Sequence, residues 1–105
     1  LPTEKVYLDL YIIGLGEAGK RKGFEILDEV RSHGFVADFA YGDRALKGAM
    51  KGADRLGAKF VLVLGDDEVA SGRAEIKDLS DGKGHSVTLA SLVSALVSLT
   101  EAQTR

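Results

Sequence analysis

Apolar residues fall along this chain in two patterns, continuous runs and stripes with helical spacing. The runs over residues 6–13 and 59–64 are almost free of polar residues and rich in β-forming ones, which predicts buried strands. A shorter run over residues 35–40 predicts a third strand. The stripes lie between and after these runs, so strands and helices are expected to alternate.

Two amphipathic helices are predicted between the three strands. The first extends from about residue 17 to residue 33. Its expected inner face consists of Phe24, Ile26, Leu27 and Val30. The second begins at Asp43, the predicted N-cap, and ends before Gly57. Its expected inner face consists of Leu46, Ala49, Met50, Ala53 and Leu56. A last helix is predicted from residue 89 onward.

The run over residues 59–64 is followed by Gly65 and an acidic turn, Asp66-Asp67-Glu68. The partly alternating segment 73–79 then leads to Asp81-Gly82, a dipeptide typical of hairpin turns, and residues 84–88 form the second arm. This arrangement predicts a carboxylate, Glu68, and a cation, Lys77, placed to face one ligand.

The predicted order is β-α-β-α-β-β-β-α. Strands joined by helices pair in parallel, and hairpin arms pair antiparallel. We therefore expect an α/β fold with a five-stranded mixed sheet in three α/β/α layers. Ligands of such sheets favour the carboxyl ends of the parallel strands, which here comprise residues 14–19, 41–44 and 65–68. We call this edge the rim.

The composition adds limits to this fold. A chain of 105 residues forms a single domain, 1–105, with an expected core over about 5–100. The absence of cysteine excludes disulfides and thiolate chemistry, and no arrangement typical of a catalytic or metal site stands out. No apolar run is long enough for a membrane span. The chain starts without Met, so we expect a piece of a larger protein. A net charge of −2 means that any nucleic-acid binding must come from local clusters.

One motif at the rim points to nucleotides. Residues 14–19 read G-L-G-E-A-G, which matches the turn of dinucleotide-binding folds. Such folds place an acidic residue at the end of the second strand, whereas Asp38 lies within that strand and Asp43 lies beyond it. Glu17 would also bring negative charge to the phosphates. A tight turn without a nucleotide is the favoured interpretation, and nucleotide binding remains the alternative.

A second cluster points to nucleic acid. The predicted outer face of the second helix carries one basic stripe, made of Arg44, Lys47, Lys51 and Arg55. The stripe is either a solvated helix face or a track for phosphate groups. Tyr41, just past the second strand, is either a half-buried rim residue or a ring on which a base stacks.

Two segments carry a family resemblance. Residues 46–58 read L-K-G-A-M-K-G-A-D-R-L-G-A, and residues 64–72 read L-G-D-D-E-V-A-S-G, followed by I-K-D-L and the D-G turn. They resemble the anticodon-binding domain of class II aminoacyl-tRNA synthetases, and most of all the C-terminal domain of bacterial-type histidyl-tRNA synthetases. The resemblance covers roughly residues 5–100, and Leu15-Gly16-Glu17 also fits it.

The resemblance implies a function and a set of residues. It implies recognition of a tRNA anticodon loop, that of tRNA(His), through the rim and the hairpin, with roles for Asp43, Glu68 and Lys77. Together with the residues above, the expected RNA-contacting set is Gly16, Glu17, Tyr41, Asp43, Arg44, Lys47, Lys51, Glu68 and Lys77. Neither DNA nor a membrane is an expected partner.

The resemblance also implies that the catalytic site lies elsewhere in a cytoplasmic, homodimeric parent ligase. No cofactor is expected in this domain, while ATP and Mg are expected in the catalytic domain of the parent. A regulatory or dimer-supporting use of the same fold without RNA, as in a histidine-biosynthesis regulatory subunit, is the main alternative.

Overall fold

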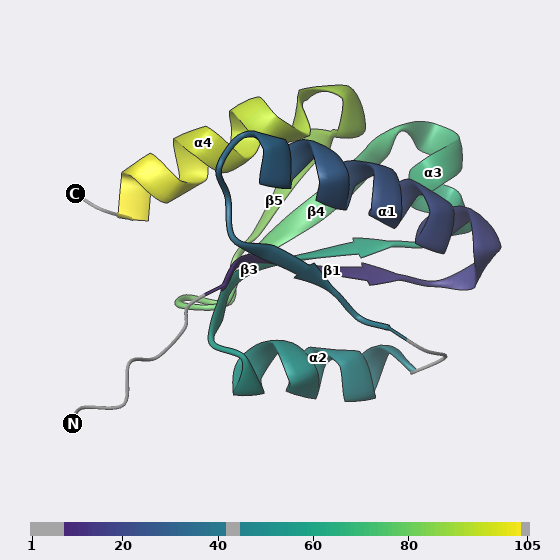
Figure 1. The fold of residues 1–105 in the computed structure, drawn as a ribbon, viewed down its shortest axis with the longest axis horizontal. Coiled ribbons are helices and arrows are strands. Elements are labelled where there is room, and N and C mark those ends of the chain that lie inside the picture. The colour runs from purple at the N-terminus through teal and green to yellow at the C-terminus, as the bar shows by residue number, and fades with distance from the viewer. Residues whose placement is uncertain (1–7, 42–44, 104–105) are drawn as a thin grey trace.

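A computed structural model describes residues 8–41 and 45–103 of the chain. Its five strands and four α-helices follow one another as shown in Figure 1. The elements are β1 (Leu8–Gly14), α1 (Gly16–Ser32), β2 (Ala37–Phe39), α2 (Leu46–Arg55), β3 (Ala58–Leu64), α3 (Asp66–Ser71), β4 (Arg73–Asp78), β5 (Gly84–Thr88), the short 3-10 helix η1 (Leu89–Ser91) and α4 (Leu92–Gln103).

The strands form one mixed sheet in the order β2-β1-β3-β4-β5. β1 pairs in parallel with β2 and β3, because α1 and α2 carry the chain back between them. β4 pairs antiparallel with β3 and β5, and the hairpin turns at Gly82, which has a φ of +76°. The predicted mixed sheet and its strand pairing are confirmed.

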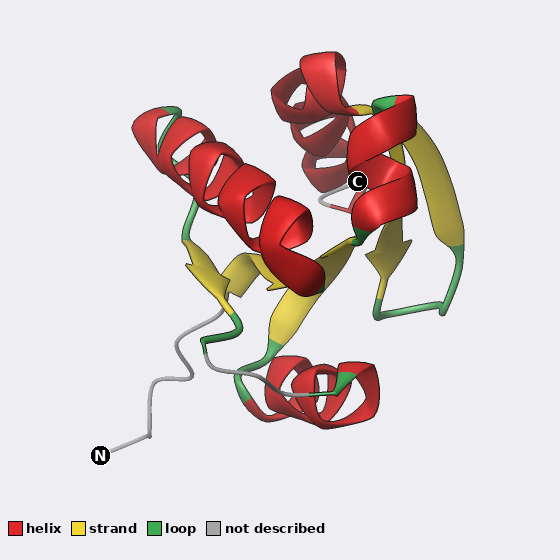
Figure 2. Ribbon diagram, turned by 90° about the vertical axis from the view of Figure 1, so that its right-hand side faces the viewer, coloured by secondary structure: helices red, strands yellow, loops and turns green. Residues whose placement is uncertain are grey.

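Helices cover both faces of the sheet, which confirms the three layers (Figure 2). On one face, α1 and α4 pack over strand residues that include Leu10, Ile12, Phe60, Leu62 and Ile76. On the other face, α2 packs against β1 and β3 through Ala49 and Ala53. The hairpin is not covered by α2, so the α2-side face of β4 and β5 is open.

Three local predictions are wrong. Residues 66–71 form helix α3 and not merely a turn, because three acidic residues in its first turn complement the helix dipole and Gly72, with a φ of +72°, ends it. The predicted inner faces are wrong in part: Phe24 does not belong to that of α1, since 48% of it is exposed, and Leu46 and Leu56 do not belong to that of α2, since 43% and 41% of them are exposed. The N-cap position of α2 is Ala45, so Asp43 is not the cap; Asp43 and Arg44 lie outside the described residues.

Candidate nucleic-acid interface

Close backbone packing builds the rim. The Leu15 N–H donates to the Leu64 carbonyl at 2.7 Å, which ties the first turn of α1 to the end of β3. A Cβ atom at Gly19 would lie 2.2 Å from the Leu64 carbonyl oxygen, and one at Gly14 would lie 2.7 Å from the Gly19 carbonyl oxygen. Packing therefore explains these glycines of the G-x-G-x-x-G motif without a nucleotide.

The second glycine of the motif, Gly16, is explained by its backbone conformation. Gly16 is exposed, has a φ of +74°, and faces the Asp66 carboxylate, whose Oδ1 atom would lie 3.4 Å from an added Cβ. Glu17 is exposed in the same first turn of α1. These two carboxylates make this part of the rim a place for hydrogen-bond donors rather than for phosphates.

Glu68 has a structural role in addition to any role in binding. Its Oε1 atom accepts a hydrogen bond of 2.7 Å from the Gly65 N–H, which satisfies a free donor at the start of α3. The side chain is half-buried. The carboxylate thus lies at the rim, as predicted, but one of its oxygens is occupied by the protein itself.

The hairpin places Lys77 farther from the rim than the sequence suggested. Lys77 is exposed and pairs with Val61, three residues before β3 ends at Leu64, so it lies roughly 10 Å from the rim along the strand. Both side chains point to the α2-side face of the sheet, where Val61 is buried under α2 and Lys77, beyond the helix, is exposed. Helix α3, which carries Glu68, packs against α1 instead. The structure therefore does not bring Glu68 and Lys77 together.

Arg73 is the hairpin cation at the rim, and sequence reasoning missed it. It begins β4 directly after α3, is exposed, and its Nη2 atom donates to the Ser86 Oγ at 2.9 Å across the hairpin. Arg73 and Lys77 share one side of the strand, about 13 Å apart along it. The alternation of exposed residues 73, 75 and 77 was a signal for this placement.

The α2 stripe lies on the surface. Lys47, Lys51 and Arg55 are exposed, on the side of α2 opposite the buried Ala49 and Ala53. Successive members are four residues, or about 6 Å, apart. The stripe therefore presents a row of cations beside the sheet, as predicted. Tyr41 lies two residues past the end of β2, and 56% of its surface is exposed.

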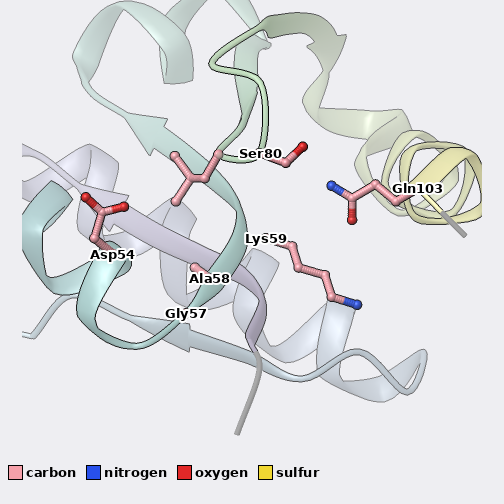
Figure 3. A pocket seen from close by; sticks show the side chains of 7 residues that line it. Asp54, Gly57, Ala58, Lys59, Ser80 and Gln103 are labelled. Atoms are coloured by element: carbon pink, nitrogen blue, oxygen red, sulfur yellow. The ribbon is translucent and has the colours of Figure 1, made fainter. Parts of the chain in front are cut away.

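A cavity lies at the other end of the strands (Figure 3). It has a volume of about 450 Å³ and lies where β3 begins and the hairpin turns. Its lining is Asp54, Gly57, Ala58, Lys59, Leu79, Ser80 and Gln103. None of the predicted RNA-contacting residues lines it.

A hydrogen-bonded network beside this cavity connects the hairpin to α4. The Asp78 Oδ1 atom accepts from the Ser80 N–H at 2.8 Å, the Ser80 Oγ at 2.6 Å and the Gln103 Nε2 at 3.2 Å. Burial raises the pKa of Asp78, but these hydrogen bonds, helped by the nearby His85, outweigh it and leave the pKa below its ordinary value.

Comparison with known proteins identifies the class. A family model described as anticodon binding domain matches residues 9–99, and the chain therefore belongs to the anticodon-binding domain family. It is 47% identical over 97 residues to the histidine–tRNA ligase of Corynebacterium jeikeium, which covers 92% of this chain and 22% of that relative. The chain thus spans about a fifth of the length of the curated relatives it matches.

Solved structures agree with this assignment. Apo histidyl-tRNA synthetase from S. aureus matches with a TM-score of 0.84 and 38% identity, over 91% of this chain and 28% of that one. The RNA-binding domain of threonyl-tRNA synthetase from Cryptosporidium parvum has a TM-score of 0.78 at 15% identity, over 87% of this chain and 23% of that one, and supports the fold alone. The family resemblance noted in the sequence is confirmed. No helix within residues 8–41 and 45–103 has the length and apolarity to cross a membrane.

Proposed function

We propose that this domain reads the anticodon loop of a tRNA, tRNA(His), on behalf of a histidine–tRNA ligase. The observation that carries the proposal is the exposed row of Lys47, Lys51 and Arg55 on the helix that flanks the sheet. Cations spaced along one helix suit successive phosphates, although the chain as a whole has a net charge of −2. The family and its relatives supply the identity of the RNA.

The rim and the stripe have different tasks in this proposal. An ionised carboxylate only accepts hydrogen bonds, so Glu68 and Glu17 suit the amino and imino groups of bases and repel phosphates. Lys77 and Arg73 on the open hairpin face can donate to base carbonyls or ring nitrogens. Lys47 and Lys51 hold the RNA backbone, which positions the loop without reading it.

The rest of the parent enzyme supplies the chemistry in this proposal. The aminoacylation site, with its ATP and Mg, lies outside these 105 residues, and the parent is a cytoplasmic homodimer. The support is the resemblance together with the share of about a fifth of each relative that this chain spans. Neither the rim nor the stripe requires a cofactor for RNA binding.

Titration of the chain with tRNA(His) at two salt concentrations tests the proposal. We expect a dissociation constant on the order of 10⁻⁴ to 10⁻⁶ M that weakens steeply as salt rises, because contacts elsewhere in the parent are missing. No binding at low salt would favour the regulatory use of the fold without RNA. ATP and NAD should give no saturable heat, and a clear signal with either would revive the glycine-turn alternative.

A further inference from the structure

Three aromatic rings from two elements meet at the β2 edge of the sheet. Phe24 of α1 stacks on Phe39 of β2 with a centroid separation of 4.4 Å and an interplanar angle of 15°. Tyr41 lies against both, with centroid separations of 6.1 Å from Phe24 and 5.7 Å from Phe39. We call these three residues the aromatic platform.

Two of the three platform rings are exposed although they are large and aromatic. Phe39 is buried, whereas 48% of Phe24 and 56% of Tyr41 are exposed to solvent. The rings are held in place from below: a Cβ atom at Gly23 would lie 2.4 Å from the Phe39 ring, so a glycine is needed there for the ring to lie against α1. The result is a supported surface of aromatic rings rather than two loose side chains.

A cation lies next to the platform. A cavity of about 200 Å³ on the same edge is lined by Tyr11, Asp38, Phe39, Tyr41, Arg55 and Leu56. It therefore joins two of the platform rings to Arg55, the last member of the α2 stripe. Its volume is below the roughly 300–1,000 Å³ typical of small-molecule sites, which favours a single flat group over a whole ligand.

We infer that the aromatic platform stacks one unpaired base of the bound RNA, while Arg55 contacts a phosphate next to that base. The inference rests on the proposed function and adds Phe24 and Arg55 to the RNA-contacting surface, while the buried Phe39 supports the two exposed rings. Every base offers a flat π-face, and proteins bind single strands by combining such stacking with cations that follow the backbone. Tyr41 and Arg55, which line one small cavity, provide the ring for stacking and the cation for the backbone.

Charge favours RNA over a protein partner at this edge. The cation that lines the cavity belongs to a helix whose outer face repeats the same charge at Lys47 and Lys51. A nucleic-acid backbone complements such a row along its length, whereas an apolar protein surface would leave the row unused. An RNA loop that enters at the rim can also reach the aromatic platform, because Tyr41 belongs to both the rim and the platform.

The test uses anticodon stem-loops of tRNA(His), each with one loop base replaced by 2-aminopurine, whose fluorescence falls on stacking. The wild-type chain should quench the signal at one loop position. Phe24→Leu and Tyr41→Leu should abolish that quenching and weaken binding at least about fivefold. Tyr41→Phe and Phe24→Trp keep a ring and should retain it. Val36→Ala, at an exposed residue of the same edge outside the platform, is the matched control and should change neither signal.

Different outcomes separate the two proposals. If the stem-loop binds but both leucine variants keep full affinity and quenching, the platform inference is wrong and the proposed function stands. If the wild-type chain binds no stem-loop, both are wrong. If Phe24→Leu spares RNA binding but destabilises the full-length parent more than this chain, the platform packs against protein and the inference is again wrong. Thermal unfolding of each variant verifies that it is folded.

Discussion

The two ends of the sheet use their polar groups in opposite ways. Where β3 begins, Asp78, Ser80 and Gln103 satisfy one another through three hydrogen bonds. At the rim, Glu17, Tyr41 and Arg73 are exposed, and the backbone below them is closely packed. The first end holds the fold together, and the second is the end that we propose to contact the RNA.

Cavity volume alone would select the end opposite to the proposed binding surface. The cavity of about 450 Å³ lies beside the network of Asp78, Ser80 and Gln103, away from the rim, and comes near the stripe only at its last residue, because Asp54 and Gly57 line it. A loop of RNA needs an exposed surface with separated donors, acceptors and rings, and the volume of a cavity does not measure these. The contrast between the ends is therefore a contrast between stability and recognition, and substitutions can test it.

The largest expected effect comes from the packing that supports the rim. Gly19→Ala places a methyl group 2.2 Å from the Leu64 carbonyl oxygen, so backbone has to move. We expect a loss of about 3 kcal/mol or more in the free energy of unfolding, and loss of RNA binding with it. Chemical denaturation measures the first quantity.

Gly48→Ala is the matched control for that change. Gly48 lies in α2, and nothing lies within 4 Å of an added Cβ atom. Alanine should therefore stabilise the helix by roughly 0.5–1 kcal/mol. A tolerated Gly19→Ala would mean that the motif glycines have a purpose other than packing.

Asp78→Ala should affect stability only. Removing the carboxylate leaves Ser80 and Gln103 without their acceptor, which should lower the free energy of unfolding by about 2–3 kcal/mol. RNA affinity should stay unchanged. Asp81→Ala, which removes an exposed acceptor for the Lys83 N–H, should cost less. Reduced RNA affinity in a folded Asp78→Ala variant would contradict the division between the ends.

The contribution of Asp78 should depend on pH in one direction. Its pKa is lower in the folded protein than the ordinary value of about 3.9, so its stabilisation is complete above that value and is lost as pH falls through the folded pKa. The stability difference between wild type and Asp78→Ala should thus be constant above about pH 5 and narrow below about pH 4. Denaturation curves across this range provide the measurement.

The sequence predicted the stable part of the fold better than the rim. Long apolar runs and helical stripes are strong signals, and they identified the mixed sheet and the long helices. Helix α3 was missed because six residues hold too little periodicity, and its acidic first turn was read as a loop. Phe24 was assigned to the core because its helical position is apolar, but the helix overhangs the edge of a three-residue strand.

The roles of the charged side chains were harder to predict than the elements that carry them. Strand register decides that Arg73, and not Lys77, lies at the rim, and register depends on pairing between distant segments. The cap that Glu68 provides for its own helix follows from a backbone conformation at Gly65 that composition does not reveal. Both outcomes therefore needed three-dimensional information.

Substitutions of Glu68 test whether this carboxylate recognises bases in addition to stabilising the start of α3. Glu68→Ala should lower discrimination among anticodon variants by roughly 1–3 kcal/mol in the full-length parent, as measured by aminoacylation efficiency across a substituted tRNA series. Glu68→Gln keeps an acceptor for the Gly65 N–H but loses the charge, so it should preserve stability and still lower discrimination. An unchanged anticodon ranking in both variants would make Glu68 purely structural.

The smallest effect is expected on the stripe. Lys51→Ala should weaken binding to all anticodon variants alike and reduce the slope of log affinity against log salt by about one unit, because one phosphate contact is lost. Arg73→Ala should instead change the ranking of anticodons. Salt titrations of both variants separate positioning from reading, and a base-specific effect of Lys51→Ala would reverse these roles.

The most direct test of the account maps the RNA-bound surface by amide chemical shifts of the chain titrated with the tRNA(His) anticodon stem-loop. The account predicts changes at residues 15–18, at Phe24, Tyr41 and Lys77, at 66–73 and along the outer face of α2, and none at residues 78–83 or at Gln103. Changes centred on the hairpin turn and the end of α4 would contradict it, because recognition would then occur at the end assigned here to stability.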